Sequence, residues 1–171
     1  MGLDMYLMST PKKKREWKEI ENDLLYVDYY SPEYPKTEDV AYWRKANAIH
    51  QWFVDNCQNG EDECGYGLVT KQQIIDLLHT CQKVNNELRM AKKIFKTEKD
   101  YKNEDYTYIV YDINDLKETV DLLPTQSGFF FGDTEYNEWY KVDIEETIDI
   151  CINILLTFDF DENYLFYHSS W

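Results

Sequence analysis

Apolar residues recur along the 171-residue chain with two different periods, and these periods indicate where strands and helices lie. Residues 3–8 (LDMYLM) alternate between apolar and polar positions, which is typical of a strand with one buried face. Residues 24–30 (LLYVDYY), 107–113 (TYIVYDI) and 164–171 (YLFYHSSW) are rich in aromatic and aliphatic side chains. They are predicted to be strands as well.

Three longer segments repeat apolar residues every three or four positions, as amphipathic helices do. The first predicted helix covers residues 38–57, with Thr37 as its N-cap. The second begins after a capping box of Thr70 and Gln73 and carries apolar residues as far as Phe95.

The third predicted helix covers residues 135–157, with Asp133 or Thr134 as the cap. A shorter helix is predicted over 114–123, a polar loop over 96–106, and a buried extended segment over 128–132 (GFFFG).

The order of these elements indicates the fold class. Strands are predicted near both termini and in the middle, and they do not alternate strictly with helices. We therefore expect an α+β fold, with a mainly antiparallel sheet and three main helices packed on it. The length of the chain favours one domain over residues 1–171.

The formal net charge is −15, from 33 acidic and 18 basic residues. This balance argues against direct, non-specific DNA binding, which requires Lys and Arg to displace counterions from phosphates. Residues 133–162 contain ten acids and one lysine, a formal charge of −9. They form either a solubilising surface or a surface that imitates nucleic acid and binds a basic partner. The residues proposed for partner binding are Asp133, Glu135, Glu138, Trp139, Glu145, Glu146 and Asp149.

The sequence gives no indication of a metal ion, a cofactor or a membrane span. The four cysteines lack C-x-x-C spacing, so we expect free thiols in a reducing compartment. Neither a signal peptide nor a long apolar run is evident, so we expect a soluble, cytoplasmic protein.

No catalytic motif is recognisable, which favours a binding protein over an enzyme without excluding catalysis. Asn47 and His50 lie one turn apart on the apolar face of the first predicted helix. Gln126 and Ser127 lie in a polar turn before three phenylalanines. These four residues are the candidates for a catalytic or ligand site. A structural hydrogen-bond network is the alternative for His50. The helix and the turn are expected to pack together so that their polar groups meet.

Three blocks of the sequence, MGLDMYL, VAYWRKANAIHQWFVDN and LLPTQSGFFFGDTEYNEWY, carry a resemblance. Together they resemble a family of small proteins from phages, prophages and bacterial mobile elements. The resemblance covers about a third of the chain and transfers no catalytic residues. It implies an anti-defence protein, such as an anti-CRISPR protein.

Three functions follow as hypotheses, and the least specific is a structural or regulatory phage protein that binds a host factor. The first is an inhibitor whose acidic surface binds a bacterial defence nuclease, specifically a type II RNA-guided nuclease or its complex with guide RNA. The alternative is a small-molecule or nucleotide binding protein, or an enzyme, with a pocket near His50 and Gln126.

Overall fold

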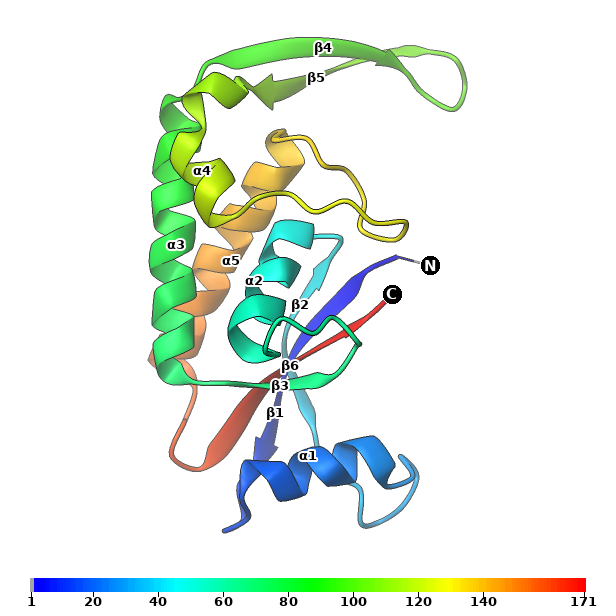
Figure 1. Ribbon diagram of the computed structural model, residues 1–171, viewed down its shortest axis with the longest axis vertical. Helices are drawn as coiled ribbons and strands as arrows, with labels where there is room; N and C mark the ends of the chain where they lie inside the picture. Colours follow the sequence, from blue (N-terminus) through cyan, green and yellow to red (C-terminus); the bar gives the residue numbers. More distant parts are fainter. Residues whose placement is uncertain (1) are drawn as a thin grey trace.

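The computed structural model describes residues 2–171 and has a four-stranded sheet at its centre (Figure 1). The strands are β1 (Asp4–Pro11), β2 (Glu38–Arg44), β3 (Tyr66–Val69) and β6 (Asn163–Ser170). They lie in the order β2-β1-β6-β3, and every neighbouring pair is antiparallel. Because β1 and β6 pair over their whole length, the first and last described residues lie on the same side of the molecule (Figure 1).

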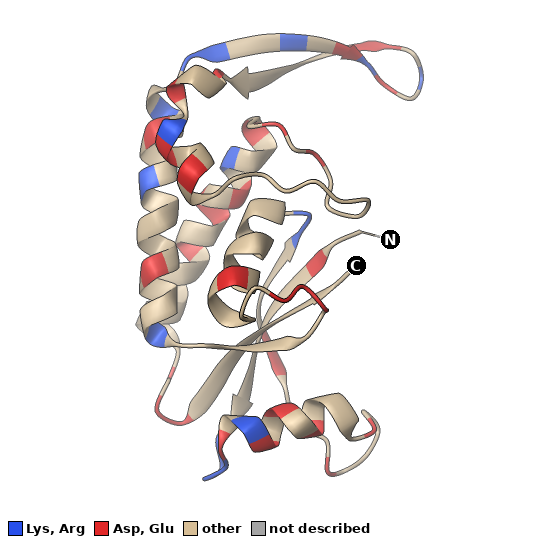
Figure 2. Cartoon of the chain, in the orientation of Figure 1, with Lys and Arg blue, Asp and Glu red and all other residues tan. Residues whose placement is uncertain are grey.

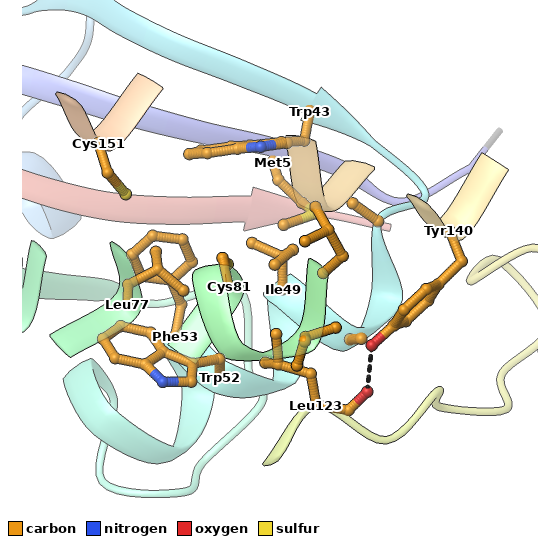
Figure 3. Close-up of a cluster of buried hydrophobic side chains, with 14 of the residues drawn as sticks. Met5, Trp43, Ile49, Trp52, Phe53, Leu77, Cys81, Leu123, Tyr140 and Cys151 are labelled. Carbon is orange, nitrogen blue, oxygen red and sulfur yellow. Dashed lines mark hydrogen bonds between the residues drawn. The ribbon is translucent and has the colours of Figure 1, made fainter. Parts of the chain in front are cut away.

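Three helices cover one face of this sheet and enclose the main core. They are α2 (Asn47–Cys57), α3 (Lys71–Met90) and α5 (Glu138–Thr157). Figure 3 shows Phe53 from α2 beside Leu77 of α3, with Met5 from β1 in the same core. The prediction of an α+β fold with a mainly antiparallel sheet and three main helices is therefore confirmed.

The opposite face of the sheet is partly covered by α1 (Trp17–Tyr26), which buries Ile20 and Leu24 against Phe166. The predicted strand over residues 24–30 is therefore wrong. Its first residues complete α1, because Ile20 and Leu24 are four positions apart and face the sheet together. The residues that follow α1 form an exposed loop.

The predicted helix over residues 38–57 is wrong in its first part, because these residues form β2 along β1. Trp43 is buried opposite Met5, while Tyr42 and Arg44 on either side are exposed, which is the alternation of a strand. Lys45 then adopts a left-handed backbone conformation with φ of 60°, and α2 begins at Asn47.

A hairpin of β4 (Lys93–Lys99) and β5 (Asp105–Tyr111) projects beyond the helices at one end of the molecule (Figure 1). The predicted strand near 107–113 is confirmed, but the polar loop predicted over 96–106 is partly β4. All residues of β4 are exposed, so the strand carries no buried face that a sequence pattern could show. The predicted short helix is present as η1 (Ile113–Asp115) and α4 (Lys117–Leu122).

The loop between α4 and α5 is closed by polar side chains. Asn137 is the N-cap of α5, and its Oδ1 accepts from the N–H groups of Trp139 (3.0 Å) and Tyr140 (3.1 Å). Asp133 and Thr134 are not the cap, because Asn137 directly precedes the helix. The Tyr140 hydroxyl donates to the Leu123 carbonyl at 2.8 Å, which ties α5 to the end of α4 (Figure 3).

Candidate functional site

Asn47, the first residue of α2, fixes the 124–137 loop to the helix. Its Nδ2 donates to the carbonyl oxygens of Phe131 (3.1 Å) and Asp133 (2.8 Å). Its Oδ1 accepts from the backbone N–H of Gln126 at 2.8 Å. The side chain is buried, with every polar atom engaged, so it acts as a three-bond staple between α2 and the loop.

His50, one turn further along α2, is fully buried in a second network. Its Nδ1 lies 2.7 Å from the Tyr167 hydroxyl, and its Nε2 lies 3.0 Å from Oδ2 of Asp62. The other carboxylate oxygen of Asp62 accepts from the indole N–H of Trp171 at 3.1 Å. Because both ring nitrogens of His50 are engaged within the protein, this geometry supports the structural alternative for His50.

Gln126 and Ser127 lie in the loop above α2. The Gln126 side chain is half-buried and donates only to the Pro124 carbonyl at 3.3 Å, while Ser127 is exposed. The predicted packing of α2 against this loop is observed, through Asn47 and through the edge-on contact of His50 with Phe131. The structure thus brings Asn47, His50 and Gln126 to one corner of the molecule.

The three phenylalanines do not form the buried extended segment that the sequence predicted. The Phe131 N–H donates to the Gly128 carbonyl at 3.1 Å, which closes a turn, and the Phe129 side chain is 96% exposed. Phe130 accepts a backbone hydrogen bond from Leu3 at 2.9 Å. The segment therefore borders the start of β1, and of its three phenylalanines only Phe131 packs against the core.

A cavity of about 260 Å³ lies where β2 meets α2, between the 124–137 loop and the first turns of α5. We call it the corner cavity. Asn47 contributes to its wall and His50 does not. Gln126 borders a different cavity of about 480 Å³, between α2 and α4. The corner cavity is lined by residues 44–49, Thr125, Gly132, Asp133, Glu135, Asn137, Trp139, Tyr140, Asp143 and Ile144.

The acids of the corner cavity differ in their pairing. Glu135 binds Lys96 and accepts from the Tyr108 hydroxyl, and these bonds, Lys96 first, lower its pKa despite the opposing effect of desolvation. Asp133 accepts from the Asn137 side chain and from the Glu135 N–H. Asp143 has no hydrogen-bond or ion-pair partner for its carboxyl group within residues 2–171. Burial, with a smaller effect of Glu146, raises the pKa of Asp143 to about 7.

The proposed partner-binding acids lie on the exposed side of α5 and in the loop before it (Figure 2). Glu145 is paired with Lys141 at 2.8 Å, one turn away on the same helix. Glu138, Glu146 and Asp149 are exposed and form no salt bridge with another described residue. The carboxylates of these three residues are therefore available to a partner.

A groove of about 600 Å³ separates this side of α5 from β5. We call it the acidic groove. Tyr106 and Tyr108 of β5 stack on each other along one wall, with ring centres 5.4 Å apart. Trp139 and Val142 of α5 form the other wall, and the Trp139 side chain is 77% exposed. Glu138, Trp139 and Glu145, which the sequence analysis selected for partner binding, all line this groove.

Sequence reasoning missed Asp143 and Lys45 as candidates. Asp143 lies in a run of acids that is typical of a solvated surface, and its burial depends on how α5 packs. Lys45 lies in what was predicted to be the middle of a helix, and its position follows from the turn between β2 and α2. For Arg44 and Lys45, the sequence offered one signal: they form a basic pair shortly before Asn47, where α2 begins.

Three further observations bear on function. No family model, no curated protein and no solved structure matches this chain. Within residues 2–171, no cluster of three or more His, Cys, Asp or Glu side chains could hold a metal ion, and no helix is both long and apolar enough to cross a membrane. The four cysteines are free thiols, as the sequence predicted.

Proposed function

We propose that the protein is an inhibitor that binds a basic protein surface through the acidic groove and the exposed acids of α5. The observation that carries this proposal is the combination, in one groove, of exposed aromatic rings with two carboxylates. Glu138 has no partner among the described residues, and Glu145 is paired with Lys141 of the same groove. Aromatic side chains contribute contact area at protein interfaces, and carboxylates select a basic partner.

The chemistry of the groove fits arginine and lysine side chains. A guanidinium group can stack on the Trp139 indole or the Tyr106 ring and still reach a carboxylate such as Glu138. The unpaired acids along α5 present negative charges in a row, as the phosphates of a nucleic-acid strand do. A protein channel that binds nucleic acid would therefore also attract this surface.

The partner we propose is a bacterial defence nuclease, and specifically a type II RNA-guided nuclease, alone or with its guide RNA. Such nucleases hold the guide–target duplex in a positively charged channel. The resemblance of three sequence blocks to proteins of phages and mobile elements supports this choice. The DNA of phages and mobile elements is the target of such nucleases in the bacterial cytoplasm. The net charge of −15 opposes a direct role in binding nucleic acid.

Purified proteins test this proposal directly. A type II nuclease would be mixed with the protein, with and without guide RNA, and complex formation and target cleavage would be measured between 50 and roughly 200 mM salt. We expect a complex that weakens as salt increases and that blocks target binding. Failure to form a complex at low salt in both conditions would refute the proposal for this class of nuclease.

Charge reversal separates a binding surface from a solubilising one. Substitution of Glu145, Glu146 and Asp149 by Lys is expected to lower the affinity about tenfold or more, chiefly through slower association. The matched control reverses Glu33, Glu61 and Glu63, which are exposed and lie outside the groove. Equal effects of the two triple substitutions would mean that only total charge matters.

The alternative function, a pocket shared by His50 and Gln126, receives less support. Both nitrogens of His50 are bonded inside the protein, and His50 lines neither of the two cavities at this corner. Asn47 is likewise saturated. The geometry that favours a small ligand is that of the corner cavity. Its candidate binding residues are Asp143 and Lys45, and not His50 and Gln126 as expected from the sequence.

A further inference from the structure

The corner cavity contains a carboxyl group with no evident structural role. Asp143 is half-buried on α5, and the two neighbouring acids of the cavity, Asp133 and Glu135, are both hydrogen-bonded within the protein. Withdrawing a carboxylate from water without a partner destabilises a fold. A half-buried carboxyl group without a protein partner at a cavity wall is therefore a candidate for contact with a ligand.

Basic groups border the same cavity from the β2–α2 turn. Within the described chain, Lys45 forms no salt bridge, and Arg44 forms only a long contact of 3.9 Å with Asp4. Both side chains are exposed at the end of β2. They are the nearest available cationic groups for an anion that enters the cavity.

The backbone fixes the position of Lys45. Its N–H donates to the Leu3 carbonyl at 2.8 Å, and its left-handed conformation directs the chain from β2 into α2. Two glycines flank its aliphatic stem. A Cβ atom at Gly2 would lie 2.9 Å from Cε of Lys45, and one at Gly132 would lie 3.2 Å from Cβ and Cδ. A side chain at either glycine would therefore require the lysine stem to shift.

The remaining walls are mainly apolar and partly aromatic. Ile49 and Ile144 are buried, Tyr140 is nearly so, and the exposed Trp139 indole borders the opening. A planar ring can pack against such walls. The volume of about 260 Å³ is slightly below the range of most ligand pockets, which is roughly 300–1,000 Å³. A single heterocycle fits such a space better than a larger ligand, and any charged tail would remain at the mouth.

We propose that the corner cavity binds a guanine mononucleotide, with the base on Asp143 and the phosphate on Lys45 and Arg44. Guanine suits a single carboxylate because its N1–H and its 2-amino group donate two parallel hydrogen bonds. The phosphate suits the two exposed cations, since guanidinium and ammonium groups both bind phosphate oxygens. This inference is independent of any nuclease partner.

Calorimetric titration of the whole protein with four ligands at about 0.15 M salt tests the inference. We expect saturable binding of GMP, weaker binding of guanosine because it lacks the phosphate, and weak or no binding of UMP because uracil has no amino group. AMP offers only one amino group to Asp143 and is expected to bind less tightly than GMP. Tighter binding of AMP than of GMP, or no saturable binding of GMP at about 1 mM, would overturn the proposal.

Two variants and a control assign the contacts. Asp143→Asn is expected to weaken GMP binding at least tenfold, because the amide keeps one acceptor oxygen but places an amino group, a donor, opposite a donor of the base. Lys45→Gln is expected to weaken GMP binding by a similar factor while leaving guanosine unchanged. Glu146→Gln removes the same charge from the neighbouring turn of α5 and is expected to change GMP binding less than twofold. Equal losses for Asp143→Asn and Glu146→Gln would contradict a specific contact, and melting temperatures no lower than that of the wild type would verify that each variant is folded.

Discussion

The first turn of α2 and the first half of α5 face the same cavity, but their polar side chains are paired differently. On α2, Asn47 and His50 are buried and every polar atom of their side chains has a partner within the protein. On α5, the carboxyl group of Asp143 is half-buried and has no hydrogen-bond or ion-pair partner among the described residues. Glu138 and Glu146 are exposed. The polar side chains of the two helices therefore have different roles.

The difference separates stability from binding. A buried polar group whose bonds are complete stabilises one conformation, and removing it leaves its partners unsatisfied. A polar group without partners contributes nothing comparable to the folded state, so its substitution can change binding without loss of stability. Substitutions on the two helices should consequently have opposite signs in melting experiments.

The largest expected effect is that of Asn47→Ala. The substitution removes three hydrogen bonds and leaves the carbonyl groups of Phe131 and Asp133 without donors. We expect a loss of about 3 kcal/mol in unfolding free energy, or roughly 6–12 °C in melting temperature for a chain of this size. Chemical denaturation followed by far-ultraviolet circular dichroism measures it.

Asn47→Asp is the matched variant for this experiment. The carboxylate can still accept from the Gln126 N–H but cannot donate to the two carbonyl groups. We expect a loss as large as that of Asn47→Ala, because a charge in a largely buried position adds to the lost donors. A variant as stable as the wild type would show that the staple contributes little.

His50→Ala is expected to cost about 2 kcal/mol, because it leaves the Tyr167 hydroxyl without its buried partner and creates a cavity. His79→Ala, on the exposed side of α3, is the control and is expected to change stability by less than about 0.5 kcal/mol. Unchanged melting of His50→Ala together with lost ligand or partner binding would instead assign His50 to a site.

Elements that bury a continuous face could be predicted from the sequence, and elements that bury little could not. Helix α3 was predicted correctly at its start because its capping box precedes an unbroken apolar stripe. Strand β2 was mistaken for a helix because Val40 and Trp43 are three positions apart, which is a helical spacing, whereas the pairing with β1 makes this segment a strand. Strand β4 was missed because none of its side chains is buried.

The candidate site was predictable to the same limited degree. Asn47 and the polar turn before the phenylalanines were expected to meet, because polar groups on apolar surfaces need partners, and they do. The sequence could not show that these bonds saturate each other. It also could not distinguish Asp143 from the exposed acids around it, because burial on α5 depends on contacts between distant elements.

Asp143→Asn tests the unpaired side of the comparison by its pH dependence. The folded pKa of about 7 exceeds the ordinary value of 3.8, so the folded state retains a proton that the unfolded state releases between these values. The wild type should therefore lose stability as the pH rises from about 4 to 7. Burial and, to a smaller extent, Glu146 raise the pKa of Asp143; the other titratable groups around the cavity are Tyr140 on α5, Asp133 and Glu135 in the loop, and Arg44 and Lys45 at the corner.

The Asp143→Asn variant has no carboxyl group to ionise at this position, so it should not lose stability in this way as the pH rises. At pH 8 we expect Asp143→Asn to be more stable than the wild type by about 1–2 kcal/mol, and at pH 4 the two proteins should be similar. Denaturant titrations at both pH values measure the difference. A variant that is less stable than the wild type at pH 8 would mean that Asp143 has a structural partner after all, and the contrast between the two helices would fail.

The smallest expected effect is that of Gln126→Ala. Gln126 combines a backbone group that is bonded within the protein with a side chain that is nearly free of partners. The backbone N–H of Gln126 is held by Asn47, but its side chain makes only a long bond to the Pro124 carbonyl within its own turn. Alanine retains the backbone bond, so we expect a change in unfolding free energy of less than about 0.5 kcal/mol. Any loss of GMP or partner binding in this variant would then belong to the side chain alone, because the loop would still be fixed to α2. A loss of stability approaching that of Asn47→Ala would instead place the Gln126 side chain within the structural network and remove it as a candidate for binding.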